Sequence, residues 1–193
     1  MSTSLISKRF LNLKGIRYAT IKIPENLDYL YLYGTENIPV EQIAKNVILQ
    51  DKQSTVMAII PAANHIQIKS LNAHLQRNLE LIQQVNIRGY QLHCAPGRLP
   101  CLGEAFGFET IIDESFADSN DIYFTSGNPG ELIRISTKDF NLLNSNAWYG
   151  KTFSSREKFP SKKASPKNSD KTTPSVSEIR RLVDTINNLH ITV

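Results

Sequence analysis

The sequence predicts an α/β protein of the α+β type, with a mixed, largely antiparallel central sheet surrounded by helices. The 193 residues suit one domain of ordinary size with an appendage, and the 40% hydrophobic content suffices for a sizeable core. Helical and strand periodicities alternate along the chain, but hairpin signals replace a repeated strand–helix–strand order. This order favours hairpins with helices packed around them.

The first elements are two helices with a strand between them. Residues 4–14 have helical apolar spacing and stop before Gly15, a residue typical of the position just past a helix C-terminus. Residues 17–23 alternate as a strand and stop at Pro24. Residues 38–44 are expected to form a short helix that leads directly into a strand.

A hairpin of two apolar strands follows. Residues 46–50 and 55–60 are separated by the polar turn at 51–54. Both strands are apolar on both faces, which is typical of the middle of a sheet. Residues 67–76 then show the spacing of a helix with one apolar face.

Further strands are predicted in the second half of the chain, at 108–112, 122–125 and 132–135. The glycine- and proline-containing turn at 127–130 joins the last two into a hairpin. Ser136 or Thr137 then caps a helix that contains Phe140. The expected globular domain covers residues 1–150.

Two appendages follow this domain. Residues 151–174 are rich in Ser, Lys, Pro and Thr and predict a basic, disordered linker, since the stretch up to residue 175 holds seven Lys or Arg and two acidic residues. Residues 175–193 begin with a capping box and predict an amphipathic helix. Its apolar stripe implies a partner, which is this domain, a second copy in a homodimer, or a C-terminal domain that begins here.

Composition argues against several classes of protein. No apolar run approaches the ~20 residues of a membrane-spanning helix, and the N-terminus lacks the order of a secretory signal, so we expect a cytoplasmic protein without membrane contact. Cys94 and Cys101 have only His93 nearby, which falls short of the ~4 ligands of a zinc site. We therefore expect no metal and no cofactor.

The residues that carry chemistry form no common nucleophile motif. G-x-S-x-G, H-E-x-x-H, Walker and G-x-G-x-x-G patterns are all absent from the sequence, and Ser126 has no base near it in sequence. Residues 95–107 contain three glycines and two prolines and predict a rigid, sharply turning loop. Such a loop either turns backbone N–H groups toward a carbonyl or oxyanion, or serves as a tight crossover between sheet edges. Residue types alone leave both interpretations open.

Several blocks resemble the YbaK family, the free-standing relatives of the editing domain inserted in bacterial prolyl-tRNA synthetases. AKNVIL at 44–49 resembles the family's AKTLLL block, and GRLPCLG at 97–103 resembles its G-x-x-x-P-x-G loop. Further similar blocks are MAIIPA at 57–62, DES at 113–115, DIYFTSG at 121–127 and IRIS at 133–136. The similarity runs in order over about residues 5–145. The loop is most similar to that of members in which an HDOD domain follows the deacylase domain.

The resemblance implies a YbaK-like editing-domain fold and an aminoacyl-tRNA deacylase. Such an enzyme hydrolyses the ester that joins a wrong amino acid to the 3′ end of a tRNA, and the attacking group is water or a ribose hydroxyl. The resemblance assigns the catalytic side chain to Lys45 and the binding of the aminoacyl carbonyl by backbone N–H groups to Gly97 and Gly103. Residues expected to line the substrate pocket are Leu99, Cys101, Leu102, Thr125, Ser126 and Gly127.

One position departs from the family pattern. The loop proline of the family falls on Cys101, and Pro100 stands one position earlier. This departure leaves the substrate preference open. It also motivates a second hypothesis, a non-catalytic domain that senses an aminoacyl group or tRNA and signals through the C-terminal helix.

Overall fold

The computed structural model describes residues 3–23, 38–87, 90–93, 97–151 and 153–156. Compact units cover Met1–Lys158 and Phe159–Val193, and the described residues belong to the first. The predicted helix at 175–193 and the larger part of the predicted linker lie outside the described residues. The fold below is that of the first unit.

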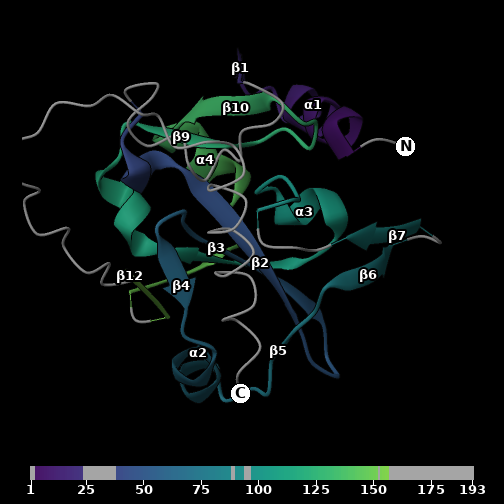
Figure 1. Ribbon diagram of the computed structural model, residues 1–193, viewed down its shortest axis with the longest axis vertical. Helices are drawn as coiled ribbons and strands as arrows, with labels where there is room; N and C mark the ends of the chain where they lie inside the picture. Colours follow the sequence, from purple (N-terminus) through teal and green to yellow (C-terminus); the bar gives the residue numbers. More distant parts are fainter. Residues whose placement is uncertain (1–2, 24–37, 88–89, 94–96, 152, 157–193) are drawn as a thin grey trace, which may run out of the picture. The chain divides into compact units, whose positions relative to one another are not determined.

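A five-stranded sheet forms the middle of this unit (Figure 1). Its strands are β11 (Trp148–Gly150), β8 (Glu109–Asp113), β3 (Thr55–Pro61), β2 (Ala44–Gln50) and β5 (Glu80–Leu81), in this order. β2 and β3 pair antiparallel from Ala44 opposite Pro61 to Gln50 opposite Thr55. Nearly every residue of both strands is buried, so the prediction of a central apolar hairpin is confirmed.

The pairing in this sheet is mixed. β8 runs parallel to β3, and β11 runs parallel to β8. Parallel neighbours need a long crossover, and the chain between β3 and β8 supplies it. That crossover includes α2 (Ile68–Leu75), the hairpin of β6 (Gln84–Ile87) with β7 (Tyr90–His93), and the short helix α3 (Gly103–Phe106).

A second, three-stranded sheet is antiparallel throughout. Its order is β1 (Ala19–Lys22), β10 (Glu131–Ser136) and β9 (Asp121–Thr125). The predicted hairpin of β9 and β10 is confirmed, with Leu132 opposite Thr125. A single parallel bridge between Ile43 and Tyr123 joins this sheet to β2. The two sheets therefore meet at the start of β2.

Most of the predicted helices are present. α1 covers Thr3–Leu13, and Gly15 follows it with a left-handed φ of 67°, as predicted. α4 covers Thr137–Leu143, and the Ser136 side chain accepts a hydrogen bond from the Asp139 amide as its cap. The helix predicted at 38–44 is shorter than expected: only Val40–Gln42 form a 3₁₀ turn, η2, because the residues from Ala44 onward pair with β3. A second 3₁₀ segment, η3, covers Glu114–Asp118.

The folded unit also extends beyond residue 150, so the predicted domain boundary falls too early. β12 (Ser154–Arg156) pairs antiparallel with β4 (Asn64–Ile66), and the preceding Phe153 is 1% exposed. Ser154 Oγ accepts from Asn64 Nδ2 at 2.8 Å and donates to the buried carboxylate of Asp113. These contacts, made by residues far apart in sequence, hold the end of the unit against the five-stranded sheet.

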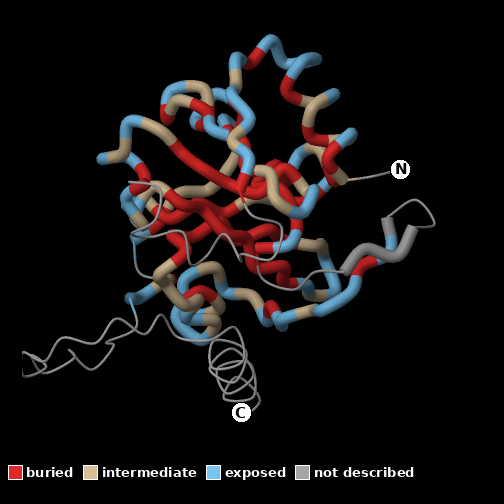
Figure 2. Tube along the Cα trace, turned by 45° about the horizontal axis from the view of Figure 1, so that its top comes forward, coloured by how far each residue is buried: buried red, intermediate tan, exposed pale blue. Residues whose placement is uncertain are grey.

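The hydrophobic core lies on both faces of the β2–β3 hairpin. Ala44, Ile48, Met57 and Ile59 contribute to the larger group, here called the main cluster, together with residues of α1, α4 and the 97–103 loop. The opposite face carries a second cluster, in which Val47, Leu49 and Ile60 pack with Leu71 of α2 and Phe153. Figure 2 shows the buried residues concentrated along these strands.

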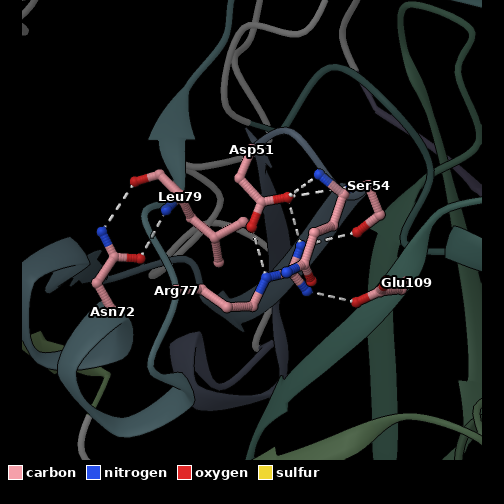
Figure 3. A network of polar contacts seen from close by, with 7 residues as sticks. Asp51, Ser54, Asn72, Arg77, Leu79 and Glu109 are labelled. Atoms are coloured by element: carbon pink, nitrogen blue, oxygen red, sulfur yellow. Dashed lines mark hydrogen bonds and ion pairs between the residues drawn. The ribbon is translucent and has the colours of Figure 1, made fainter.

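A polar network fixes the turn between β2 and β3 (Figure 3). The Arg77 guanidinium donates to both carboxylate oxygens of Asp51 at 2.7 Å and also to Ser54 Oγ and Glu109. These hydrogen bonds, with those from the Ser54 and Gln53 amides, hold the pKa of Asp51 well below its usual range. The turn, the segment after α2 and the start of β8 are thereby joined.

Candidate active site

Lys45 is a buried lysine in a largely apolar strand. Its residue is 7% exposed, and every neighbour on β2 from Ala44 to Leu49 is also buried. Because side chains alternate along a strand, Lys45 lies on the face of Val47 and Leu49, opposite the main cluster. Lysines are almost never this deeply buried without a partner or a task, which makes Lys45 the first candidate for function.

Lys45 lies where the two sheets begin to diverge. The parallel bridge joins Ile43 of the chain before β2 to Tyr123 of β9. The bridge is isolated, and Lys45 and Thr125 each stand two residues beyond it along their own strands. Thr125 is buried as well. Lys45 and Thr125 therefore both follow the point at which the two sheets meet.

Thr125 continues into a turn that α1 braces. Thr125 Oγ1 accepts from the Gly127 amide at 3.1 Å, and Ser126 Oγ accepts from the amide two residues further on. Ser7 Oγ donates to the Ser126 carbonyl at 3.2 Å, and Thr3 Oγ1 donates to the Gly127 carbonyl at 3.1 Å. Gly127 has a left-handed φ of 92°, and a Cβ there would lie 2.4 Å from Thr3 Oγ1. Ser126 and Gly127 thus shape this turn, and their binding of substrate stays a prediction.

The backbone at the start of the predicted loop lies beside β2, on the edge where β5 pairs further along the strand. The Gly97 amide donates to the Asn46 carbonyl at 2.9 Å, and Gly97 turns the chain with a left-handed φ of 74°. The amide that the resemblance assigns to the substrate carbonyl is therefore engaged within the protein. Among the residues that the structure describes, other loop amides have no acceptor, namely those of Arg98, Leu99, Cys101 and Gly103.

The loop side chains expected to line a substrate pocket pack into the main cluster. Leu99, Cys101 and Leu102 are each at most 2% exposed. Burial raises the pKa of the Cys101 thiol to about 12, so the group stays neutral near pH 7. Their side chains hold the loop in place. Of the four loop residues whose amides have no acceptor in the described part of the chain, Arg98 is exposed and the other three are buried.

Gly103 owes its identity to close packing. It begins α3, and a Cβ at this position would lie 2.1 Å from Thr110 Oγ1 on β8. Its backbone conformation is not left-handed. Glycine is therefore required here for the approach of α3 to the sheet, whatever its amide binds.

Sequence reasoning missed Asn46. Its side chain is fully buried on the main-cluster face, and Nδ2 donates to the Leu99 carbonyl and lies 3.9 Å from Cys101 Sγ. Its Oδ1 has no hydrogen-bond partner in the described part of the chain. An asparagine inside an apolar strand was the available signal, because a buried amide needs partners.

The described surface also holds a pocket that is separate from Lys45 and the loop. This pocket of about 380 Å³ lies beside η2 and η3, where Glu41 and Arg156 form an ion pair of 3.6 Å. Within the described ranges no group of three or more metal-ligating side chains is found, and no helix there is long and apolar enough to cross a membrane.

Comparison with known families decides the class of protein. The model of the aminoacyl-tRNA editing domain matches residues 31–142, which is more than half of the chain and includes every predicted site residue. The chain belongs to the aminoacyl-tRNA editing domain family. The resemblance to YbaK-type proteins is thereby confirmed. No curated protein matches this editing domain in sequence.

Solved structures show the same fold. One is described as a candidate trans-editing enzyme for prolyl tRNA synthetase, with 15% identity and a TM-score of 0.65 over 77% of this chain and 95% of that one. Another is a candidate signal transduction protein from Marinobacter aquaeolei VT8, with 18% identity and a TM-score of 0.60. The match covers 78% of this editing domain chain but 30% of the Marinobacter protein. The predicted fold class is confirmed.

Proposed function

We propose that this editing domain is an aminoacyl-tRNA deacylase that hydrolyses the ester between a wrong amino acid and the 3′ end of a tRNA. The observation that carries the proposal is the burial of Lys45, which is 7% exposed on an apolar strand just after the bridge that joins the two sheets. The adjacent loop supplies amides without acceptors among the described residues. A cation and oriented amides match the charge that develops during ester hydrolysis.

In the proposed reaction, water adds to the ester carbonyl carbon and gives up a proton, for which a neighbouring ribose hydroxyl of the substrate is the relay. The carbonyl oxygen becomes an oxyanion, which the Lys45 ammonium and the loop amides stabilise. The intermediate then expels the ribose oxygen, which takes up the proton that the water gave up, so that a free amino acid and a free ribose hydroxyl result. Each well-placed donor is worth on the order of 3 kcal/mol. No protein nucleophile is needed in this reaction. The Ser126 hydroxyl accepts from the Asn128 amide and also interacts with the carboxylate of Glu131.

The proposal places the reaction in the cytoplasm, with aminoacylated tRNA as the partner. The basic stretch from Lys151 to Lys171, with seven Lys or Arg, supplies contacts to phosphates. Truncation after Lys158 should weaken tRNA binding and flatten its salt dependence. An unchanged salt slope would exclude a contribution from the four lysines that the truncation removes, Lys162, Lys163, Lys167 and Lys171.

The test is deacylation of a panel of mischarged tRNAs by the wild-type chain and by Lys45→Met, which keeps the length of the side chain without its charge. We expect cleavage of at least one substrate, and a loss of about 10²–10³-fold in rate on substitution, as for removal of one oxyanion donor. Lys69→Met, at an exposed position of α2, is the matched control and should leave the rate unchanged. A panel in which the wild-type chain cleaves nothing would refute the proposal.

A sensor domain is the second candidate function. The likeness to a signal transduction protein of which this chain spans 30% favours it, as does the packing of Leu99, Cys101 and Leu102 into the core. Such a domain would bind an aminoacyl group or tRNA without turnover. Calorimetric binding of a non-hydrolysable aminoacyl-adenosine, together with no cleavage of the corresponding ester, would support the sensor, and measurable cleavage would exclude it.

A further inference from the structure

Asn46 holds the 97–103 loop at three points. Its backbone carbonyl accepts from the Gly97 amide at 2.9 Å. Its side-chain Nδ2 donates to the Leu99 carbonyl and lies 3.9 Å from Cys101 Sγ. The beginning and the middle of the loop are thus attached to one residue of β2, which is itself fixed by its pairing with Ile59 of β3.

The orientation of the Asn46 amide is determined by chemistry. The Leu99 carbonyl is only an acceptor, so the group that faces it must be the NH₂ and not the oxygen. Cys101 is fully buried and its thiol stays protonated, so its sulfur receives this NH₂ as a weak acceptor. A carboxylate of the same shape would place an acceptor against the Leu99 carbonyl and repel it.

Strand alternation connects this attachment to the chemistry. Lys45 and Asn46 are neighbours on β2 and lie on opposite faces of the sheet. Asn46 therefore reaches the loop on one side while Lys45 presents its ammonium on the other. Because Lys45 and Asn46 are fixed on the same strand, any movement of the loop away from Asn46 also moves the loop amides relative to Lys45.

We propose that Asn46 is a positioning residue of the deacylase site: with Cys101 as its partner, it sets the path of the 97–103 loop and the direction of the loop amides relative to Lys45. The inference rests on the proposed function. It also accounts for Cys101, because the contact with Asn46 fixes the loop at the position where the family pattern has a rigid proline. The group acts through the backbone of the loop and does not touch the reacting atoms.

The experiment compares Asn46→Asp with Asn144→Asp. Asn144 is the matched control, because it is also buried and its Nδ2 donates to a backbone carbonyl, that of Phe140 at 2.9 Å, in α4. Both variants lose a buried NH₂ group that donates to a backbone carbonyl, and only Asn46→Asp disturbs the loop, where the NH₂ also contacts Cys101 Sγ. We expect Asn46→Asp to lower kcat at neutral pH by about 10–100-fold with KM nearly unchanged, since small misplacements of catalytic donors act on the transition state. The rate relative to wild type should recover as the pH falls, because a protonated carboxyl group donates to the Leu99 carbonyl again.

A second measurement does not depend on turnover. Hydrogen exchange of the peptide that covers residues 97–103 should be faster in Asn46→Asp than in wild type and in Asn144→Asp. Asn46→Thr, which cannot span the same distance to Leu99, should show the same two effects and serves if the aspartate variant does not fold. A wild-type kcat or an unchanged exchange rate in both Asn46 variants would overturn the inference. Faster exchange in a chain whose wild type cleaves no mischarged tRNA would instead overturn the proposed function and retain the loop attachment.

Discussion

Gly103→Ala separates the packing of the loop from its chemistry. The added Cβ would lie 2.1 Å from Thr110 Oγ1, and at 3.4 Å from both Thr110 Cβ and the Phe108 carbonyl. Only the first contact is impossible, so Thr110 or α3 must move. Overpacking of this kind costs about 1–3 kcal/mol. Alanine gains at most about 1 kcal/mol over glycine in a helix, and less at the first helical residue, so we expect a net loss of about 1–2 kcal/mol.

The measurement is a double-mutant cycle with Thr110→Ala, which removes the hydroxyl that the new Cβ meets. In the single variant Tm should fall by roughly 2–8 °C for a unit of this size. In the double variant the clash is absent, and the coupling should be about 1 kcal/mol or more in favour of the pair. A single variant as stable as wild type, or a double variant that behaves additively, would refute the packing argument. Deacylation that stays low in a stable double variant would instead show that the path of the backbone at Gly103 also serves catalysis.

Further predictions concern charge, burial and the domain boundary. Arg77 holds the pKa of Asp51 below its usual range, so this pair stabilises the fold above about pH 4, and its contribution is lost as the pH falls further. Arg77→Met should therefore lower the urea midpoint at pH 6 more than at pH 3. Equal losses at both pH values would contradict this. The Cys101 thiol, with a pKa of about 12, should resist alkylation at about pH 8 in the native protein and react in denaturant, as peptide mass mapping will show; fast native alkylation would contradict its burial. Phe153→Ala should cost about 3–5 kcal/mol because the ring is 1% exposed, whereas a boundary at residue 150 would make the substitution neutral in a urea melt.

Elements with local signals could be predicted from the sequence. The hairpin of β9 and β10 follows from Gly127 and Gly130, whose left-handed φ values of 92° and 71° few other residues adopt. The start of α4 follows from Ser136, because a serine oxygen can accept from the helical amides. In each case the residue that carries the signal also makes the interaction, so no distant contact had to be known.

Elements without local signals could not be predicted. β4 and β12 are three-residue strands whose pairing depends on Asn64, Ser154 and Asp113, which are far apart in the sequence. The parallel pairing of β8 with β3 likewise depends on the whole crossover between them. The serine- and lysine-rich composition therefore predicts a linker that begins at residue 151, although residues 154–156 form a strand of the folded unit.

The candidate site was predictable in part, for a physical reason. Residue types alone gave a polar lysine beside an apolar strand and a glycine-containing loop, and the resemblance connected them. The alternation of side chains along β2 shows on which face of the sheet each of these residues lies. Lys45 and Asn46, adjacent in sequence, must face opposite sides of the sheet, so the loop that packs over Asn46 reaches Lys45 only around the edge of the strand, where the Gly97 amide pairs with the Asn46 carbonyl. The Gly97 amide therefore attaches the loop to β2 and does not donate to a substrate. The donors for a substrate must come from the residues that follow it. Substitutions at the two neighbouring positions should accordingly differ in kind: loss of the Lys45 ammonium removes a charge from the reaction, whereas loss of the Asn46 amide moves the donors while leaving that charge in place.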